Sequence, residues 1–107
     1  MKLERFEEGK TLLRRMLPVA RRVLGESNRL TLKLQSIYAA SLYRDPGATL
    51  DEIRESVTTL EDAGRTARRV LGGAHPLTSA IESKSLQNAR AALRACEDGK
   101  KVIFVEH

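Results

Sequence analysis

The chain of 107 residues has few of the side chains that usually build a catalytic or metal site. It contains no tryptophan, two tyrosines, two phenylalanines and one cysteine, Cys96. A single cysteine excludes an internal disulfide and a cysteine-rich metal site, and it fits a reducing compartment. The scarcity of aromatic residues leaves the packing to Leu, Ala, Val and Ile, which is typical of close-packed helices rather than of β-sandwiches.

Long apolar runs are also missing. Residues 1–8 contain no apolar core of signal-peptide length, and no later stretch is long enough to span a membrane. We therefore expect a soluble intracellular protein of the cytoplasm, with one domain and a modest core. The net charge of +5, from 19 basic and 14 acidic residues, permits an acidic partner without requiring one.

The most informative feature is an internal repeat. Residues 20–31, ARRVLGESNRLT, recur at 67–78 as ARRVLGGAHPLT, displaced by 47 residues. Each copy has a helix-compatible run, a glycine suited to a left-handed helix end, a turn, and a restart at Leu-Thr. The same displacement superimposes the apolar positions of the preceding helices, so the repeat covers whole helices. Such self-similarity is typical of stacked helical repeats, in which each unit completes its core with its neighbour.

Apolar residues recur three or four positions apart in four segments, which predicts four amphipathic helices. The first covers about residues 3–24 and contains Pro18, which should kink the helix or split it near Met16. The second should start after Asn28, a plausible N-cap, and end at residues 45–47, Asp-Pro-Gly.

The last two helices are marked by their starts. Thr49 with Glu52 three residues later predicts a capping box for the third helix, which runs to about Leu71. The fourth runs from about Leu77 to near Cys96, and its serine-rich start is polar and prone to fray.

The end of the chain does not belong to the helical repeat. Residues 102–105, Val-Ile-Phe-Val, are four consecutive apolar residues that favour β-structure. We therefore divide the chain into a helical domain, residues 1–96, and an extended tail, residues 97–107. Either the tail lies on the apolar surface of its own domain, or it forms an edge strand or anchor on another chain through Ile103 and Phe104.

The two turns, LGESNRLT at 24–31 and LGGAHPLT at 71–78, resemble the Leu-Gly-x-x-His-Pro-x-Thr turn of the kinesin-light-chain type of tetratricopeptide repeat (TPR). The second copy matches every fixed position, whereas the first has Asn28-Arg29 in place of His-Pro. Ala39 and Leu42-Tyr43 match further positions, and the resemblance spans roughly residues 3–95. It implies antiparallel helix pairs that form an interaction scaffold without catalysis. The paired asparagines with which that family holds peptides are replaced here at about Ser36-Ile37 and Ser83-Lys84.

His75 and Cys96 are the first residues to test as catalytic groups. The sequence offers His75 no nearby Asp, Cys or second His, so we expect it to cap or pack a helix start. Cys96 has no neighbouring His or Lys that would lower its pKa, which favours a small packed side chain. Gly72-Gly73 follows a helix and lacks the other residues of a phosphate-binding loop. We expect no enzyme activity, no cofactor and no metal.

Charged residues follow the helix dipoles, with carboxylates near helix starts and arginines near helix ends. Glu61 and Arg65, four residues apart, should form a supporting pair. The first helix carries an excess of positive charge, which is either a solvated face or a site for nucleic acid, an acidic protein or an anionic lipid surface. Its basic residues are Lys2, Arg5, Lys10, Arg14, Arg15, Arg21 and Arg22.

The sequence thus predicts an all-α domain of about four helices, stacked as antiparallel pairs, with an extended C-terminal tail. Its expected function is non-catalytic protein–protein interaction, as a scaffold or a small subunit of a larger assembly, with a protein, a peptide or a second copy as partner. The alternative is a nucleic-acid-associated protein that uses the arginine pairs at 14–15, 21–22 and 68–69. The expected partner-binding residues are Ser36, Tyr38, Tyr43 and Lys84 on an inner face, Arg15, Arg22 and Arg69 as charged contacts, and Ile103 and Phe104 in the tail.

Overall fold

The computed structural model describes residues 2–99, with the side chains described from residue 7 onward, and all regular structure in that range is helical. The all-α prediction is confirmed. Helix α1 is Lys2–Val23, α2 is Arg29–Tyr43 and α3 is Leu50–Leu71. The predicted tail contacts Ile103 and Phe104 lie outside the described residues.

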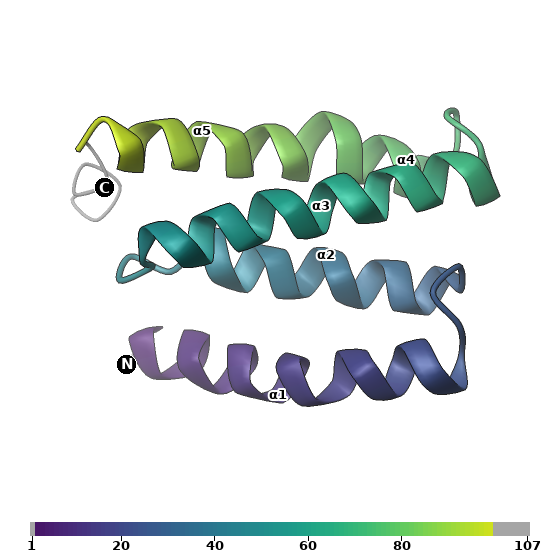
Figure 1. The fold of residues 1–107 in the computed structure, drawn as a ribbon, viewed down its shortest axis with the longest axis horizontal. Coiled ribbons are helices and arrows are strands. Elements are labelled where there is room, and N and C mark those ends of the chain that lie inside the picture. Colours follow the sequence, from purple (N-terminus) through teal and green to yellow (C-terminus); the bar gives the residue numbers. More distant parts are fainter. Residues whose placement is uncertain (1, 100–107) are drawn as a thin grey trace.

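The fourth rod of the fold, residues 76–97, consists of three helical pieces that follow one another without a break. They are α4, Pro76–Ser79, a π-helical segment η1, Ala80–Ser85, and α5, Leu86–Glu97. Successive rods run in opposite directions and each packs on its neighbours along the chain, with α2 and α3 in the middle of the stack (Figure 1). The fourth rod also reaches α2, so the core lies between α2, α3 and this rod.

The turn between α1 and α2 and the turn between α3 and α4 have the same geometry. Gly25 and Gly72 have φ values of +92° and +93°, in the left-handed region that favours glycine. Asn28 Oδ1 accepts a hydrogen bond from the Leu30 N–H at 2.8 Å, and His75 Nδ1 accepts one from the Leu77 N–H at 3.0 Å. The predicted caps at Asn28 and His75 are confirmed, and the repeat holds at the level of individual hydrogen bonds.

The predicted capping box of α3 is present. The Thr49 hydroxyl accepts a hydrogen bond from the Glu52 N–H, and the Glu52 carboxylate accepts one from the Thr49 N–H. Helix α1, by contrast, is not split near Met16 but continues through Pro18. Pro18 removes only one backbone donor and its side chain is exposed, so the remaining backbone hydrogen bonds of α1 maintain the helix on both sides of it.

The sequence did not predict the π-helical segment. The wider turn of η1 places Ile81 in the core, while Glu82 approaches Gly64 of α3 so closely that a Cβ atom at Gly64 would lie 3.2 Å from Glu82 Cγ. Glu82 also accepts two hydrogen bonds from the Arg68 guanidinium, at 3.0 and 2.7 Å. The start of the fourth rod is therefore packed and paired against α3.

Small residues allow the rods to pack closely. Ala39 of α2 and Ala63 and Ala67 of α3 are fully buried in the main core, which also contains Leu32, Leu60 and Ile81. A second cluster joins α1 to α2 through Leu13, Leu17, Tyr38 and Leu42. A third, smaller cluster of Ala48, Ile53 and Ala92 lies at the end where α3 begins.

A buried cation ties α1 to the turn between α2 and α3. Lys10 Nζ lies 2.8 Å from Asp45 Oδ2, 3.0 Å from Glu52 Oε2 and 3.1 Å from Glu7 Oε2. The Lys10 and Asp45 side chains are each only 2% exposed. Burial alone lowers the pKa of Lys10, but the hydrogen bonds to the three carboxylates together raise it above its ordinary value. Lys10, counted among the exposed basic residues from the sequence, is a structural side chain.

Candidate functional site

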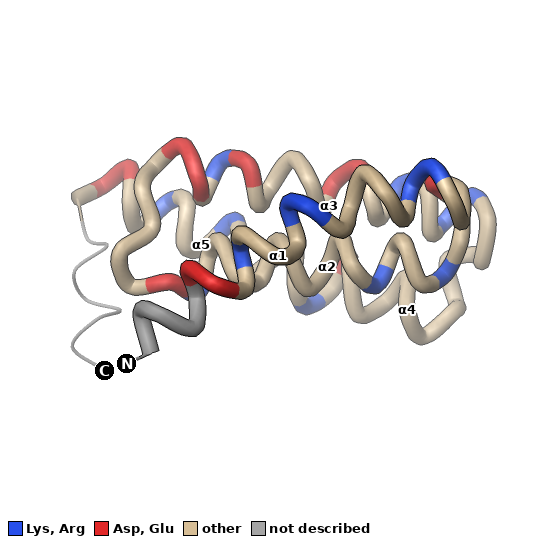
Figure 2. Tube along the Cα trace, turned by 90° about the horizontal axis from the view of Figure 1, so that it is seen from below, with Lys and Arg blue, Asp and Glu red and all other residues tan. Residues whose placement is uncertain are grey.

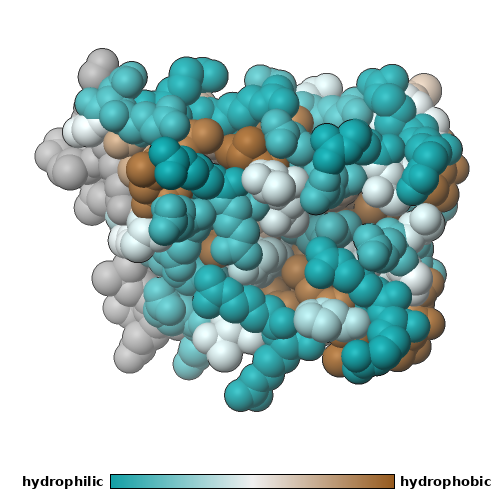
Figure 3. Space-filling view, viewed as in Figure 1, coloured by the Kyte–Doolittle hydropathy of each residue, from teal (hydrophilic) through white to brown (hydrophobic). Residues whose placement is uncertain are grey.

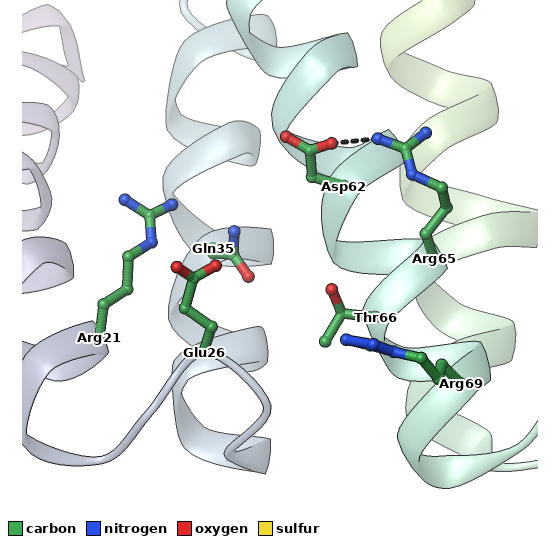
Figure 4. Close-up of a pocket in the computed structure, with 7 residues that line it drawn as sticks. All are labelled: Arg21, Glu26, Gln35, Asp62, Arg65, Thr66 and Arg69. Atoms are coloured by element: carbon green, nitrogen blue, oxygen red, sulfur yellow. Dashed lines mark hydrogen bonds and ion pairs between the residues drawn. The ribbon is translucent and has the colours of Figure 1, made fainter.

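The structure contains two grooves that flank α2 and share no residue. The first, which we name the polar groove, has α2 at its base and α1 and α3 as its walls. A pocket of about 470 Å³ opens in it, with Arg21 from α1, Gln35 from α2 and Arg69 from α3 around it (Figure 4). Its remaining lining residues are Glu26, Asp62, Arg65 and Thr66.

The polar groove continues along α1 toward Tyr38. A second hollow of about 200 Å³ shares Arg21 with the first and is bordered by Arg14, Tyr38 and Glu55. The Tyr38 hydroxyl donates a hydrogen bond to Glu55 Oε2 at 2.5 Å and accepts one from Arg14 Nε at 3.0 Å. Burial and the bond to Glu55 raise the pKa of Tyr38, while Arg14 opposes that effect. Tyr38 therefore stays protonated and links all three helices.

Charges of both signs line the polar groove. Arg65 is paired with Asp62, three residues earlier on α3, and not with Glu61 as the sequence suggested. Glu61 instead lies 3.2 Å from the Arg90 guanidinium on α5. Among the described residues, Arg21 and Arg69 form no ion pair. This mixture of charges can receive a polar segment of a partner.

The second groove, which we name the apolar groove, lies between α1 and the first half of α2. It has a volume of about 400 Å³ and a lining that is apolar apart from Arg15. Several of its side chains are far more exposed than apolar residues in a core, with Val23 72% exposed. Hydrophobic surface is visible at the lower right of Figure 3, where α1 ends and α2 begins. The lining residues are Arg15, Met16, Val19, Ala20, Val23, Leu24, Leu30 and Leu34.

The internal repeat shows why this surface is open. Met16 corresponds to Ala63, 47 residues later, yet Met16 is 39% exposed and Ala63 is fully buried. Likewise, Leu34 lines an open groove, whereas its counterpart Ile81 is fully buried in the core that α2 helps to form. Among the described helices, none covers the first copy in the way that α2 covers the second.

The predicted inner face does not form one surface. Tyr38 lies at the base of the polar groove, while Tyr43 borders a hollow between α2 and α5 together with Asn88. Five residues on a helix correspond to a rotation of about 140°, so the two tyrosines point to different sides of α2. Ser36 is half-buried on α2 and Lys84 is exposed on η1.

The predicted charged contacts are also divided. Arg15 lines the apolar groove, Arg69 lines the polar groove, and Arg22 is exposed in the last turn of α1. The arginine pairs lie on different surfaces and therefore form no continuous basic stripe. In addition, Arg14 is hydrogen-bonded to Tyr38 and Arg68 to Glu82.

Sequence reasoning missed the apolar groove because it assigned Met16, Val23 and Leu24 simply to the apolar side of an amphipathic helix. A signal was nevertheless present in the repeat itself. Leu12 and Val19 stand where the second copy has Thr59 and Thr66. A change from threonine to larger apolar residues at equivalent positions indicates that the two copies meet different surroundings.

Comparison of the chain with family models, with curated proteins and with solved structures yields no match. The described helices include none that is long and apolar enough to cross a membrane. Within residues 7–99, whose side chains are described, no three His, Cys, Asp or Glu side chains are grouped so that they could hold a metal ion.

Proposed function

We propose that the protein is a non-catalytic interaction module, acting as a scaffold or a small subunit of a larger assembly, and that it binds a protein partner through the apolar groove. The observation that supports this function is the cluster of exposed apolar side chains on two adjacent helices, with Met16, Val19 and Val23 on one side and Leu30 on the other. Scattered apolar residues are common on protein surfaces, but a contiguous apolar concavity is typical of an interaction site.

The physics of stacked repeats supports the same function. The outermost helix of such a stack needs either a polar outer side or a cover. Helix α1 exposes Leu12 and Val19 where the matching positions of α3 carry threonine, so this side of α1 has become more apolar rather than more polar. A partner that covers the groove would remove these side chains from water.

The experiment compares affinity capture by the wild-type chain and by a variant with Val19→Glu and Val23→Glu. Both side chains are exposed, so circular dichroism should show unchanged helicity. The control is Thr58→Glu, which adds negative charge at an exposed position of α3 that lines neither groove. We expect at least one protein to be captured by the wild type and the control but lost from the groove variant. Identical capture by all three, or no capture, would contradict the proposal.

No comparable observation favours the nucleic-acid alternative. Arg14 and Arg68 are held in hydrogen bonds, and Arg21 and Arg69 share the polar groove with Glu26 and Asp62. Nucleic-acid binding would be recognised by a steep loss of affinity with salt.

A further inference from the structure

We propose that the occupant of the apolar groove is an α-helix of another protein, amphipathic in sequence, with acidic residues beside its apolar stripe. This inference rests on the proposed function and specifies the chemistry of the partner.

The second copy of the repeat shows what fits such a groove. Shifted by 47 residues, the lining of the apolar groove becomes the surface between α3 and the fourth rod, which includes Ala63, Ala67 and Ile81. Its buried residues are covered by α2, whose Leu32 and Ala39 belong to the same buried cluster, whereas Val70, the counterpart of Val23, stays 46% exposed. A helix therefore fills this shape within the molecule, and it runs antiparallel to the long helix against which it packs (Figure 1). We infer that the partner helix runs antiparallel to α1.

The charges around the groove select an acidic partner. Arg15 lines the groove, and the exposed side chains of Arg22, Arg29 and Lys33 belong to the two helices that form its walls. Acidic residues gather at the end of the molecule where α1 and α3 begin, while basic residues prevail at the opposite end, where the groove lies (Figure 2). Carboxylates flanking the apolar stripe of a partner would meet this positive border, which favours encounter and orientation.

The same charges disfavour a second copy in a two-fold dimer. A symmetric pairing through the apolar grooves would bring the basic borders of both copies together, because a two-fold axis opposes identical patches. Repulsion between the two sets of Arg15, Arg22, Arg29 and Lys33 would oppose such contact.

A bilayer is a poorer fit as well. Helices that lie in the membrane interface bury an apolar face of tryptophan, phenylalanine or leucine in the bilayer, which requires that face to protrude. Here the apolar surface is concave and its lining contains no aromatic residue.

The test uses the full chain and synthetic helical peptides of 15 residues, the length of α2. One peptide has Leu and Ala at helical spacing and Glu at the remaining positions, and a matched peptide has Lys in place of Glu. Fluorescence anisotropy measures the affinity of each. We expect the acidic peptide to bind at least about tenfold more tightly than the basic one.

Two variants report on the two halves of the inference. Val19→Glu with Val23→Glu should abolish binding of the acidic peptide. Arg15→Glu with Arg22→Glu should weaken the acidic peptide by about tenfold or more and improve binding of the basic peptide. Arg94→Glu, an exposed arginine of α5 outside the groove, is the matched control and should change neither affinity.

The outcomes separate the inference from the function on which it rests. The inference that the partner helix is acidic would be overturned if the two peptides bound equally well, or if Arg15→Glu with Arg22→Glu changed neither affinity. It would also be overturned if neither peptide bound while affinity capture still depended on Val19 and Val23. The inference that the occupant is a helix of another protein would be overturned if the chain bound phosphatidylserine-containing vesicles and not the peptides. It would also be overturned if light scattering showed a dimer that Val19→Glu dissociates. If capture is also independent of Val19 and Val23, the proposed function fails as well.

Discussion

Thr31 and Thr78 occupy the same position in the two copies of the repeat, and both hydroxyls are fully buried without a hydrogen-bond partner among the described residues. Each is the third residue of its helix, after the caps Asn28 and His75. A buried polar group without a partner costs free energy, because it has lost its bonds to water. Each copy of the repeat is therefore destabilised by one unpaired threonine hydroxyl at the same position.

Replacing either threonine with valine should stabilise the protein. Thr31→Val and Thr78→Val keep the branched shape and remove the unpaired hydroxyl, so we expect the free energy of unfolding to rise by about 1 kcal/mol for each. Thr49→Val is the control, since that hydroxyl caps α3 and its loss should cost about 1 kcal/mol. Urea denaturation would distinguish the two cases, and a loss of stability in all three variants would contradict the assignment of unpaired hydroxyls.

The cap at His75 should depend on its hydrogen-bond acceptor and not on its imidazole chemistry. Asparagine performs the same task at the equivalent position 28, so His75→Asn should keep most of the stability. His75→Ala removes the acceptor and should cost about 1 kcal/mol. Thermal unfolding of the two variants gives the comparison, and an equal loss in both would show that the imidazole has another role.

The buried position of Lys10 makes it far more important to stability than an ordinary surface lysine. Lys10→Met leaves the buried Asp45 carboxylate without its cation, and we expect a loss of about 3–5 kcal/mol. Adding Asp45→Asn should recover part of that loss, because the second charge is removed while an oxygen remains to accept the Gly47 N–H. Arg22→Met, at an exposed position, should have little effect. Equal effects of Lys10→Met and Arg22→Met in denaturant titrations would refute the structural role.

The same cluster should contribute to unfolding at acid pH. Burial raises the pKa of Glu52, but hydrogen bonds from the Thr49 N–H and Lys10 lower it by more, to below its ordinary value of 4.5. Since the pKa is lower in the folded than in the unfolded chain, the stabilisation is complete above the unfolded value and is lost as the pH falls through the folded one. Glu52→Gln keeps a capping side chain but does not titrate, so its stability should fall less steeply below about pH 5. Parallel acid titrations of the two chains, followed by circular dichroism, would reveal the difference.

The features that the sequence predicted correctly are those that depend on neighbouring residues. The caps at Asn28, Thr49 and His75 each join a side chain to a backbone group two or three residues away, so residue type and spacing suffice. The positive φ values of Gly25 and Gly72 follow from the same local rule.

The features that the sequence did not predict depend on distant partners. Lys10 meets Asp45 across 35 positions, and nothing local distinguishes it from the exposed bases of α1. Met16 and Ala63 illustrate the same limit, since their different exposure depends on whether another helix packs over them. The side of α2 to which Tyr38 points was missed because the helical rotation between Tyr38 and Tyr43 was not taken into account.

Tyr38 offers a direct measurement of the contacts that join α1, α2 and α3. Its pKa is raised above the ordinary value of 10.0 by burial and by the bond to Glu55, and it is lowered by Arg14. The protonated phenol therefore stabilises the fold below pH 10, and this contribution is lost as the pH rises through the folded-state pKa. In a Tyr43→Phe background, tyrosinate absorbance would report Tyr38 alone, because the chain has only these two tyrosines.

The two neighbours of Tyr38 should move its titration in opposite directions. Glu55→Gln removes the negative charge that disfavours the phenolate, so the pKa should fall toward its ordinary value. Arg14→Met removes the cation that favours the phenolate, so the pKa should rise further. If the pKa of Tyr38 shifted in the same direction in both variants, or in neither, Tyr38 would not be held between these two charges. Helices α1 and α3 would then be joined across α2 through other contacts.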